Sequence, residues 1–177
     1  MNTGATSNAD IMREFPMLLG VVSDTHGDLP RTRAAVQMLE SLEVAVVVHC
    51  GDIGTPEIIS LFAPWPTHFV FGNCDSDRKA LAREIERARQ TCHGSFGELE
   101  LEGRRIAFLH GDDSDLLRET IDADRWDLVC HGHTHVVRHE RRGETLVLNP
   151  GAVHRANPHT IATVELPERI VNVVTIE

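Results

Sequence analysis

The sequence predicts a mixed α/β fold in which one or two β-sheets are covered by helices. In the first half of the chain, short apolar runs alternate with stretches of helical periodicity, which is typical of parallel strands joined by helices. In the second half, pairs of strand-like segments flank short turns, which is typical of antiparallel hairpins. The 177 residues are 41% hydrophobic and 25% charged, a balance that favours a globular protein over a disordered one.

Strands and helices are expected to alternate up to residue 90. Strands are predicted at 17–22, 44–48 and 68–71, and helices at 30–42, 55–62 and 76–90. The run at 44–48 is continuous and rich in valine, as in a strand buried on both faces. Thr55, Pro56 and Glu57 supply a capping residue, a proline and an acid, which together predict a helix start.

The second half is expected to contain more antiparallel pairs. Hairpins are predicted at 96–101 with 104–109, at 136–140 with 145–148 and at 160–166 with 169–176; a helix is predicted at 114–121 and a short strand at 128–130. Neither a linker nor an internal repeat interrupts the pattern, so residues 16–177 are expected to form a single domain. Residues 1–15 lack apolar periodicity and are expected to be a flexible N-terminal tail.

Composition excludes several classes of partner. The chain has 17 Lys and Arg against 27 Asp and Glu, a net charge of −10, which argues against a stable nucleic-acid complex or docking on an anionic membrane. Its apolar stretches are far shorter than the roughly 18–20 residues of a membrane span. The first ten residues do not resemble a signal peptide, and the four cysteines show no CxxC spacing. A cytoplasmic protein with reduced thiols is therefore expected.

Metal-binding residue types and glycines follow five of the expected strands. The clusters are Ser23-Asp24-Thr25-His26-Gly27, His49-Cys50-Gly51-Asp52, Gly72-Asn73-Cys74-Asp75, His110-Gly111-Asp112 and His131-Gly132-His133-Thr134-His135. Ligands of open α/β sheets bind beyond the carboxyl ends of the strands, so the five clusters could converge in one crevice. Taken singly, Asp24 could cap a helix and Asp52 could lie in a turn.

The residue types indicate which ions could bind. Aspartate, asparagine and histidine suit Mn²⁺, Fe²⁺, Zn²⁺, Co²⁺ or Ni²⁺, and do not suit a cysteine-rich structural zinc site or an all-oxygen calcium site. About seven donors are too many for one tetrahedral ion, whereas two ions that share a carboxylate would use them all. Two ions roughly 3.5–4 Å apart form a clamp for in-line displacement at phosphorus.

In this order, the five clusters resemble the five motifs of the calcineurin-like metallophosphoesterases. The cysteine in the third cluster, with Asn149-Pro150-Gly151 near the end, resembles the small bacterial and archaeal phosphodiesterases of that superfamily. The resemblance runs from Asp24 to Gly151. It implies a four-layer α-β-β-α sandwich with two mixed β-sheets, and an enzyme that hydrolyses a small phosphate diester.

The resemblance also implies a dinuclear site. By motif position, Asp24, His26 and His135 would hold the first ion, Asn73, His110 and His133 the second, and Asp52 would bridge them. A hydroxide between the ions would attack phosphorus, and Asn73 would help to stabilise charge on the equatorial oxygens. Manganese is the first expectation, with zinc, iron, nickel and cobalt as alternatives. Because similar proteins often self-associate, a homo-oligomer is compatible with the sequence.

Two positions depart from the pattern of the family. Cys74 stands where many relatives have a histidine that protonates the leaving group, and a thiol is a poor general acid. Asp112 stands where a second histidine is common; it either tunes His110 or is a loop carboxylate. Asp75, Asn149 and Arg155 are candidates for supporting the ligands or contacting substrate, although Asn149-Pro150-Gly151 could be only a turn.

Other functions fit part of the pattern. A phosphomonoesterase could use the same two-ion clamp. A non-catalytic, metal-binding interaction module would resemble the small retromer subunit, but such a scaffold need not retain its histidines, and all four motif histidines are present here. His131 precedes the matching motif by one residue, so a role other than ligand is expected. His49 matches no motif either, and is expected to be a surface or core histidine.

Overall fold

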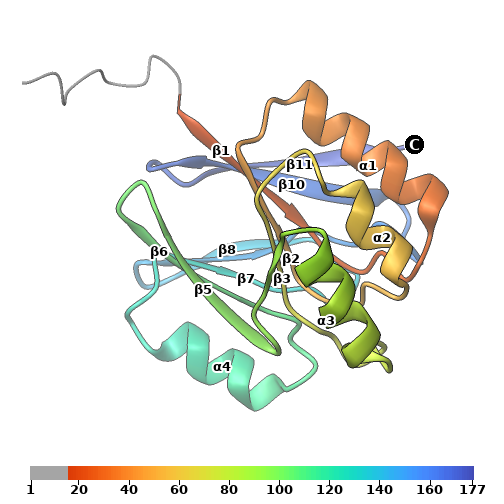
Figure 1. Cartoon of the computed structure of the whole chain (residues 1–177). Helices are drawn as coiled ribbons and strands as arrows, with labels where there is room; N and C mark the ends of the chain where they lie inside the picture. Colours follow the sequence, from red (N-terminus) through yellow and green to blue (C-terminus); the bar gives the residue numbers. More distant parts are fainter. Residues whose placement is uncertain (1–15) are drawn as a thin grey trace, which may run out of the picture.

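Two β-sheets face each other between layers of helices in the computed structural model, which describes residues 16–177 (Figure 1). The predicted tail at 1–15 lies outside the described residues. The strands are β1 (Met17–Val22), β2 (Val46–His49), β3 (Thr67–Phe69), β4 (Thr91–Cys92), β5 (Phe96–Leu101), β6 (Arg104–Leu109), β7 (Leu128–Cys130), β8 (Arg138–Arg142), β9 (Thr145–Asn149), β10 (His159–Leu166) and β11 (Ile170–Ile176). The helices are α1 (Leu29–Ser41), α2 (Pro56–Leu61), α3 (Arg78–Arg87) and α4 (Ser114–Asp122).

Both sheets are mixed, as the resemblance predicted. The six-stranded sheet has the order β11-β10-β1-β2-β3-β4, in which β1 to β4 are parallel, β10 pairs antiparallel with β1, and β11 pairs antiparallel with β10. The five-stranded sheet has the order β5-β6-β7-β9-β8, with a parallel centre and an antiparallel strand at each edge. The three predicted hairpins are therefore confirmed as β5–β6, β8–β9 and β10–β11.

Three apolar clusters hold the four layers together. Ala35 and Leu39 of α1 are buried in one cluster with residues of α2, α3 and the outer face of the six-stranded sheet. A second cluster, which contains Phe108 and Leu128, lies between the sheets. A third joins Ile121 of α4 to the outer face of the five-stranded sheet. Full burial of each large apolar side chain contributes about 1.5–3 kcal/mol, so each helix is held by its apolar face.

Local differences from the predicted elements have simple causes. Strand β4 was not predicted, because it has two residues with exposed side chains and hence no hydrophobic pattern. Thr55 is the N-cap residue of α2, but its side chain makes no capping hydrogen bond, so the fixed φ of Pro56 favours the helix start instead. None of the helices within residues 16–177 is long and apolar enough to cross a membrane.

The topology brings the polar clusters to one edge of the two sheets. Because β1, β2 and β3 are parallel, the loops that follow them leave the six-stranded sheet at the same edge. The same holds for β6 and β7 in the other sheet. Backbone hydrogen bonds join these loops to one another, from Asp24 N–H to Gly51 O (3.1 Å) and from Gly132 N–H to His110 O (2.9 Å).

Candidate metal centre

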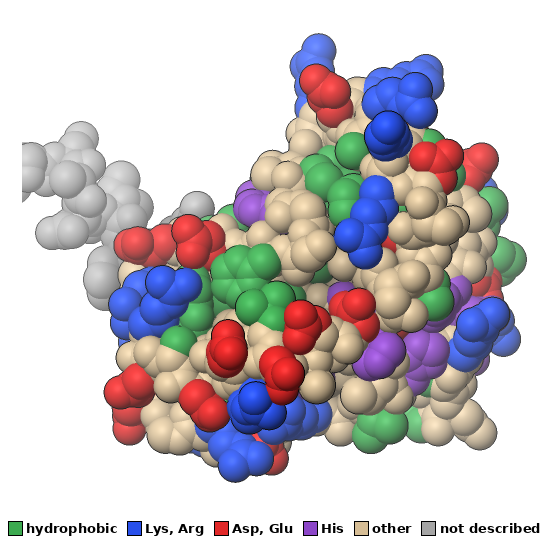
Figure 2. Space-filling model, turned by 90° about the horizontal axis from the view of Figure 1, so that it is seen from below, with side chains coloured by type: hydrophobic (Ala, Val, Ile, Leu, Met, Phe, Trp, Pro, Cys, Tyr) green, Lys and Arg blue, Asp and Glu red, His purple; other side chains and the backbone are tan. Residues whose placement is uncertain are grey.

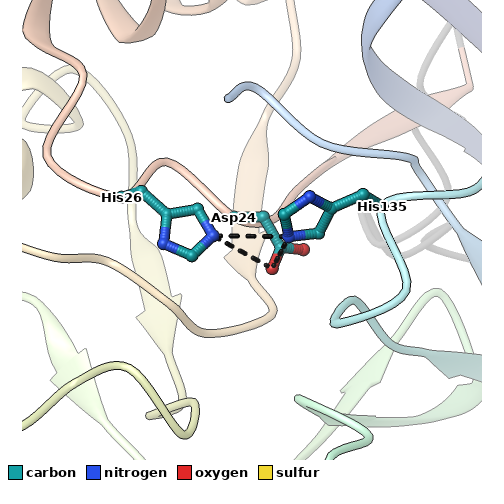
Figure 3. Close-up of side chains that lie close together, drawn as sticks. All are labelled: Asp24, His26 and His135. Carbon is teal, nitrogen blue, oxygen red and sulfur yellow. Dashed lines mark hydrogen bonds and ion pairs between the residues drawn. The ribbon is translucent and has the colours of Figure 1, made fainter. Parts of the chain in front are cut away.

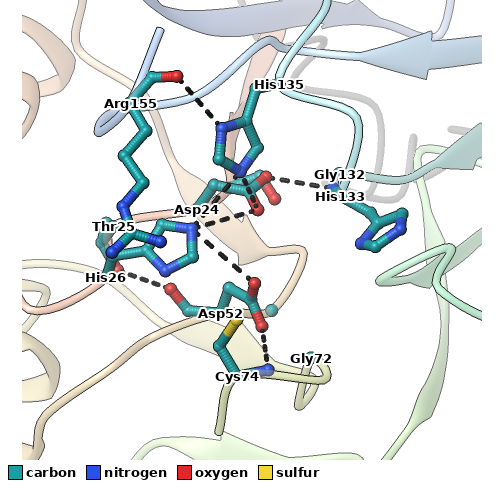
Figure 4. Close-up of polar contacts among 12 residues, drawn as sticks. Asp24, Thr25, His26, Asp52, Gly72, Cys74, Gly132, His133, His135 and Arg155 are labelled. Atoms are coloured by element: carbon teal, nitrogen blue, oxygen red, sulfur yellow. Dashed lines mark hydrogen bonds and ion pairs between the residues drawn. The ribbon is translucent and has the colours of Figure 1, made fainter.

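The structure brings all seven candidate ligands together where the loops after β1, β2, β3, β6 and β7 meet. Figure 4 labels Asp24, His26, Asp52, His133 and His135 among them. The seven are Asp24, His26, Asp52, Asn73, His110, His133 and His135. Residues more than a hundred positions apart in sequence are linked directly, since the His133 N–H donates to Asp24 Oδ2 at 3.1 Å. The five sequence clusters therefore form one site.

Asp24, His26 and His135 form the first group of donors (Figure 3). Asp24 Oδ1 lies 3.1 Å from His135 Nε2 and 3.8 Å from His26 Nε2. The two Nε2 atoms are 3.3 Å apart. Three donor atoms that face a common point at these separations can hold one small cation.

Asn73, His110 and His133 form the second group. Asn73 Oδ1 lies 3.1 Å from His110 Nε2 and 3.1 Å from His133 Nδ1. The rings of the two histidines meet edge to face with their centroids 5.1 Å apart. A carbonyl oxygen and two imidazole nitrogens are suitable donors for a divalent transition metal.

The carboxylate of Asp52 lies between the two groups. Its Oδ2 is 3.7 Å from His26 Nε2, in the first group, and 3.4 Å from His110 Nε2, in the second. Its Oδ1 accepts a hydrogen bond of 2.8 Å from the Cys74 N–H. Although burial acts to raise the pKa of Asp52, the nearby His110 and the hydrogen bond from the Cys74 N–H lower it, so this carboxylate is ionised.

The donors fit a divalent cation for a second reason. Asp24 is fully buried, and its Oδ1 has no hydrogen-bond partner among residues 16–177. Burial raises the pKa of Asp24, which shows that the site without a cation leaves this carboxylate poorly stabilised. A cation beside Oδ1 would provide the missing partner.

The backbone around the donors is strained. Asp24, His26, Asp52, His133 and His135 have φ between 46° and 69°, in the left-handed region that non-glycine residues rarely adopt. Each such residue costs about 1–3 kcal/mol and persists only where its surroundings impose it. Such clusters of strained residues are typical of functional sites.

Two glycines leave room for the carboxylates. A Cβ at position 132 would collide with Ser23 Oγ and come within 2.7 Å of Asp24 Oδ2. A Cβ at position 72 would collide with Asp52 Oδ1. Only glycine fits at these two positions without displacing a candidate ligand.

Backbone carbonyls orient two of the histidines. His110 Nδ1 lies 2.8 Å from Cys50 O, and His135 Nδ1 lies 3.2 Å from Arg155 O. A carbonyl oxygen only accepts hydrogen bonds, so Nδ1 carries the proton in each ring. The lone pair of each neutral ring is then on Nε2, which points into the site.

Asp75 and Asn149, both predicted to support the site, are buried beneath it. Asp75 accepts hydrogen bonds from the Gly54 N–H (2.9 Å) and the Gly72 N–H (2.8 Å), and so joins two of the ligand loops. The Asn149 side chain donates to Gly132 O at 2.8 Å, in the loop that carries His133 and His135.

Asp112, His131, Arg155 and His154 lie in different surroundings. Asp112 is exposed and makes no hydrogen bond or ion pair within the described part of the chain, so it is a loop carboxylate rather than a partner of His110. His131 is buried, which lowers its pKa to about 4, and it belongs to none of the donor groups. The Arg155 side chain lies beside His26 in Figure 4, and His154 Nδ1 is 2.8 Å from Asp28 Oδ2.

His49 is a supporting residue that the sequence did not single out. It is fully buried, and this lowers its pKa to about 3. Its Nδ1 accepts from the Gly51 N–H at 3.3 Å, so Nε2 carries the proton and donates to Thr25 Oγ1 at 3.0 Å. The neutral ring thus joins the loops that carry His26 and Asp52. The signal in the sequence for this supporting role was the position of His49, three residues before Asp52 and at the end of a buried strand.

The site is open to solvent on one side. Asn73, Cys74 and His133 are exposed, whereas Asp24, Asp52 and His110 are at most 2% exposed. Figure 2 shows histidine side chains gathered at one side of a face whose other parts carry acidic and basic side chains. The buried donors are therefore enclosed by the protein, and the exposed donors face the solvent.

Comparison with known families agrees with this geometry. The family model of the calcineurin-like phosphoesterase superfamily domain matches residues 17–169. The chain belongs to this superfamily. As a member of this metallophosphoesterase family, it is a hydrolase that uses divalent metal ions.

Individual relatives support the assignment to the superfamily. The chain is 30% identical over 138 residues to the phosphodiesterase MJ0936 of Methanocaldococcus jannaschii, which covers 76% of this chain and 83% of the relative. It is 28% identical over 152 residues to the probable metallophosphoesterase YsnB of Bacillus subtilis, a match that covers 82% of this chain and 83% of the relative. The solved structure of an archaeal phosphodiesterase superposes with a TM-score of 0.84 at 26% identity, covering 90% of this chain and all of the other.

Proposed function

We propose that the chain is a metal-dependent phosphodiesterase with a dinuclear site. Asp24, His26 and His135 would hold the first ion, and Asn73, His110 and His133 the second. Asp52 would bridge the two. The observation that carries this proposal is the place of Asp52 Oδ2, 3.7 Å from a donor of the first group and 3.4 Å from a donor of the second.

A bound pair of divalent ions supplies Lewis acidity and a bridging hydroxide nucleophile near neutral pH. The residues of the chain provide the local charge and a hydrogen-bond donor. Asp24 and Asp52 contribute two negative charges against the four positive charges of two ions, so the site stays attractive to a phosphate ester in an acidic protein. Asn73 is exposed at the rim, and within residues 16–177 the one hydrogen-bond acceptor of its amide nitrogen is the Cys74 sulfur, at 3.6 Å. The amide has two N–H bonds, so one of them can donate to a phosphate oxygen.

The donor set favours manganese as the resident ion, with zinc, iron, nickel or cobalt as alternatives. Two carboxylates and one amide oxygen make the site harder than a cysteine-rich site, while four histidines exclude a calcium-like site. The name of the relative MJ0936, a phosphodiesterase, supports a diester as the substrate class.

The test is an assay of metal-free protein before and after addition of Mn²⁺, with an aryl phosphodiester and the matching aryl phosphomonoester. We expect Mn²⁺-dependent hydrolysis of the diester, at a higher kcat/KM than that of the monoester. The reverse preference would establish the phosphomonoesterase alternative. Absence of turnover in protein that holds two ions would favour the interaction module.

Asp52→Ala tests the bridging assignment. We expect the bound metal to fall from two ions toward one, and the rate to fall with it. Asp112→Ala is the matched control, because Asp112 is an exposed carboxylate without a partner in the described residues. Full activity in the Asp52 variant would contradict the assignment.

Several expectations from the sequence stay predictions. They are the flexible tail at 1–15, a single domain at 16–177, a cytoplasmic location, a homo-oligomer and the lack of a stable nucleic-acid complex. Size-exclusion chromatography with light scattering tests the oligomer.

A further inference from the structure

Cys74 is the only cysteine within residues 16–177 that lies among candidate metal donors. Cys50 and Cys130 are buried, and Cys92 is exposed but belongs to no donor group. The Cys74 Sγ, a nitrogen of His26 and a carboxylate oxygen of Asp52 all lie within 4.8 Å of one another. The thiol is thus beside His26 and Asp52, two of the residues to which we assign metal ions.

The separations suit a shared ion. With bond lengths of about 2.0–2.3 Å, two ligands of a tetrahedral zinc ion lie about 3.5 Å apart. His26 Nε2 and Asp52 Oδ2 are 3.7 Å apart. Cys74 is exposed, so its side chain can rotate toward them without disturbing the core.

A second observation indicates a cation at this point. Asp24 Oδ1 is buried, has no hydrogen-bond partner among the described residues and lies 3.8 Å from the same His26 Nε2. His26 therefore belongs both to the group with Asp24 and His135 and to the group with Asp52 and Cys74. The thiol lies at the edge of the place assigned to the first ion.

We propose that Cys74 is an additional, ion-selective ligand, which binds the first ion when that ion is thiophilic, such as Zn²⁺, and stays unbound when it is Mn²⁺. Thiolate is a soft ligand that favours zinc, whereas manganese favours oxygen donors. On binding, the sulfur forms a bond to the ion and the thiol proton leaves to solvent. This inference rests on the proposed metal-dependent function.

The consequence is metal-dependent regulation of the site. Catalytic zinc sites keep one position open for water or substrate. Cys74 lies on the exposed side of the donors, from which a phosphate ester would approach. A zinc ion held by Asp24, His26, His135 and Asp52 that takes Cys74 as a further ligand has one position fewer for water or substrate, so the zinc-loaded form is expected to be slower than the manganese-loaded form.

Co²⁺ is the probe for the first test, because thiolate–cobalt bonds give an intense near-ultraviolet charge-transfer band. Metal-free wild-type protein titrated with Co²⁺ is expected to show the band, and Cys74→Ser to lack it. Cys92→Ser is the matched control, since it removes an exposed cysteine away from the donors, and it is expected to keep the band. A band that persists in Cys74→Ser, or is missing from the wild type, would overturn the proposal.

The second test measures dissociation constants for Zn²⁺ and Mn²⁺ by competition with a chromophoric chelator. Removal of the thiol is expected to weaken Zn²⁺ binding by about tenfold or more and to leave Mn²⁺ binding unchanged. Equal changes for both ions would also overturn the proposal. Neither readout depends on turnover, so a protein that shows the cobalt band but hydrolyses no diester would refute the proposed function and retain this inference.

Discussion

Substitution of Gly72 by alanine tests whether the position of Asp52 controls the site. The added Cβ would lie 2.6 Å from the Asp52 backbone nitrogen and 2.8 Å from Asp52 Cγ, and closer still to Oδ1. Non-bonded carbon contacts are most favourable at about 3.5–4.0 Å, so Asp52, including its backbone nitrogen, must move by about 1 Å. No φ strain adds to this collision, because position 72 is not in the left-handed region.

The size of the effect follows from the distances around Asp52. Its Oδ2 faces two histidine nitrogens at 3.4 and 3.7 Å, and a displacement of about 1 Å disturbs both separations. Misplacement by this amount costs about 10²-fold in rate, or about 2.7 kcal/mol of transition-state stabilisation. The overpacking itself is expected to reduce the free energy of unfolding by about 1–3 kcal/mol.

Steady-state kinetics on an aryl phosphodiester and metal analysis of the same sample measure the result. Gly103→Ala is the control, because nothing lies within 4 Å of its Cβ and its φ of +69° imposes a cost of about 1–2 kcal/mol on stability alone. We expect comparable destabilisation in the two variants and loss of activity only at position 72. Wild-type kcat/KM and metal content in Gly72→Ala would refute the reasoning.

Three further predictions follow from single groups. Asp24→Asn is expected to weaken binding of the first ion by about tenfold or more, and full occupancy of both sites by mass spectrometry would count against its assignment. A hydrogen bond to Asp52 and burial raise the pKa of the Cys74 thiol, which makes it a poor proton donor. Cys74→His is therefore expected to accelerate alkyl diesters more than aryl diesters, and an equal gain on both would contradict this. Burial lowers the pKa of His49 to about 3 and that of His131 to about 4, so the unfolded chain binds more protons below about pH 6.5. The metal-free protein is expected to lose stability between pH 6.5 and 4, by up to about 1.4 kcal/mol per pH unit for each histidine, and identical urea unfolding at pH 7 and 5 would show otherwise.

The sequence predicts the layers of the fold because apolar periodicity and turn residues are local signals. The valines of β2 and the turn at Gly103 are examples, since each is readable within a few residues. Strand β4 shows neither apolar periodicity nor a turn residue, because its two exposed residues pair with β3 only through the backbone. Its existence depends on the neighbouring strand rather than on its own residue types.

The candidate donors were recognisable because their residue types are rare in combination and follow strand ends in a fixed order. The orientation of the histidine rings could not be predicted from the sequence, because it is set by backbone carbonyl groups, which every residue has whatever its type. The Cys50 carbonyl sets the tautomer of His110, and the Arg155 carbonyl sets that of His135. Cys50 could therefore be interpreted from sequence only as a core residue, although its backbone orients a candidate ligand.

The left-handed backbone at Asp24, His26, Asp52, His133 and His135 links the fold to the proposed chemistry. Each of these residues costs stability where it stands, and hydrogen bonds between loops hold it there, such as that from the His26 N–H to Asp52 O at 2.9 Å. Other non-glycine residues with positive φ, such as Glu43, Arg89 and Glu102, lie outside the donor set, so what distinguishes the five is that their loops meet at one place. Metal binding is therefore expected to raise the stability of the folded protein, because an ion would stabilise the conformation that the backbone otherwise disfavours.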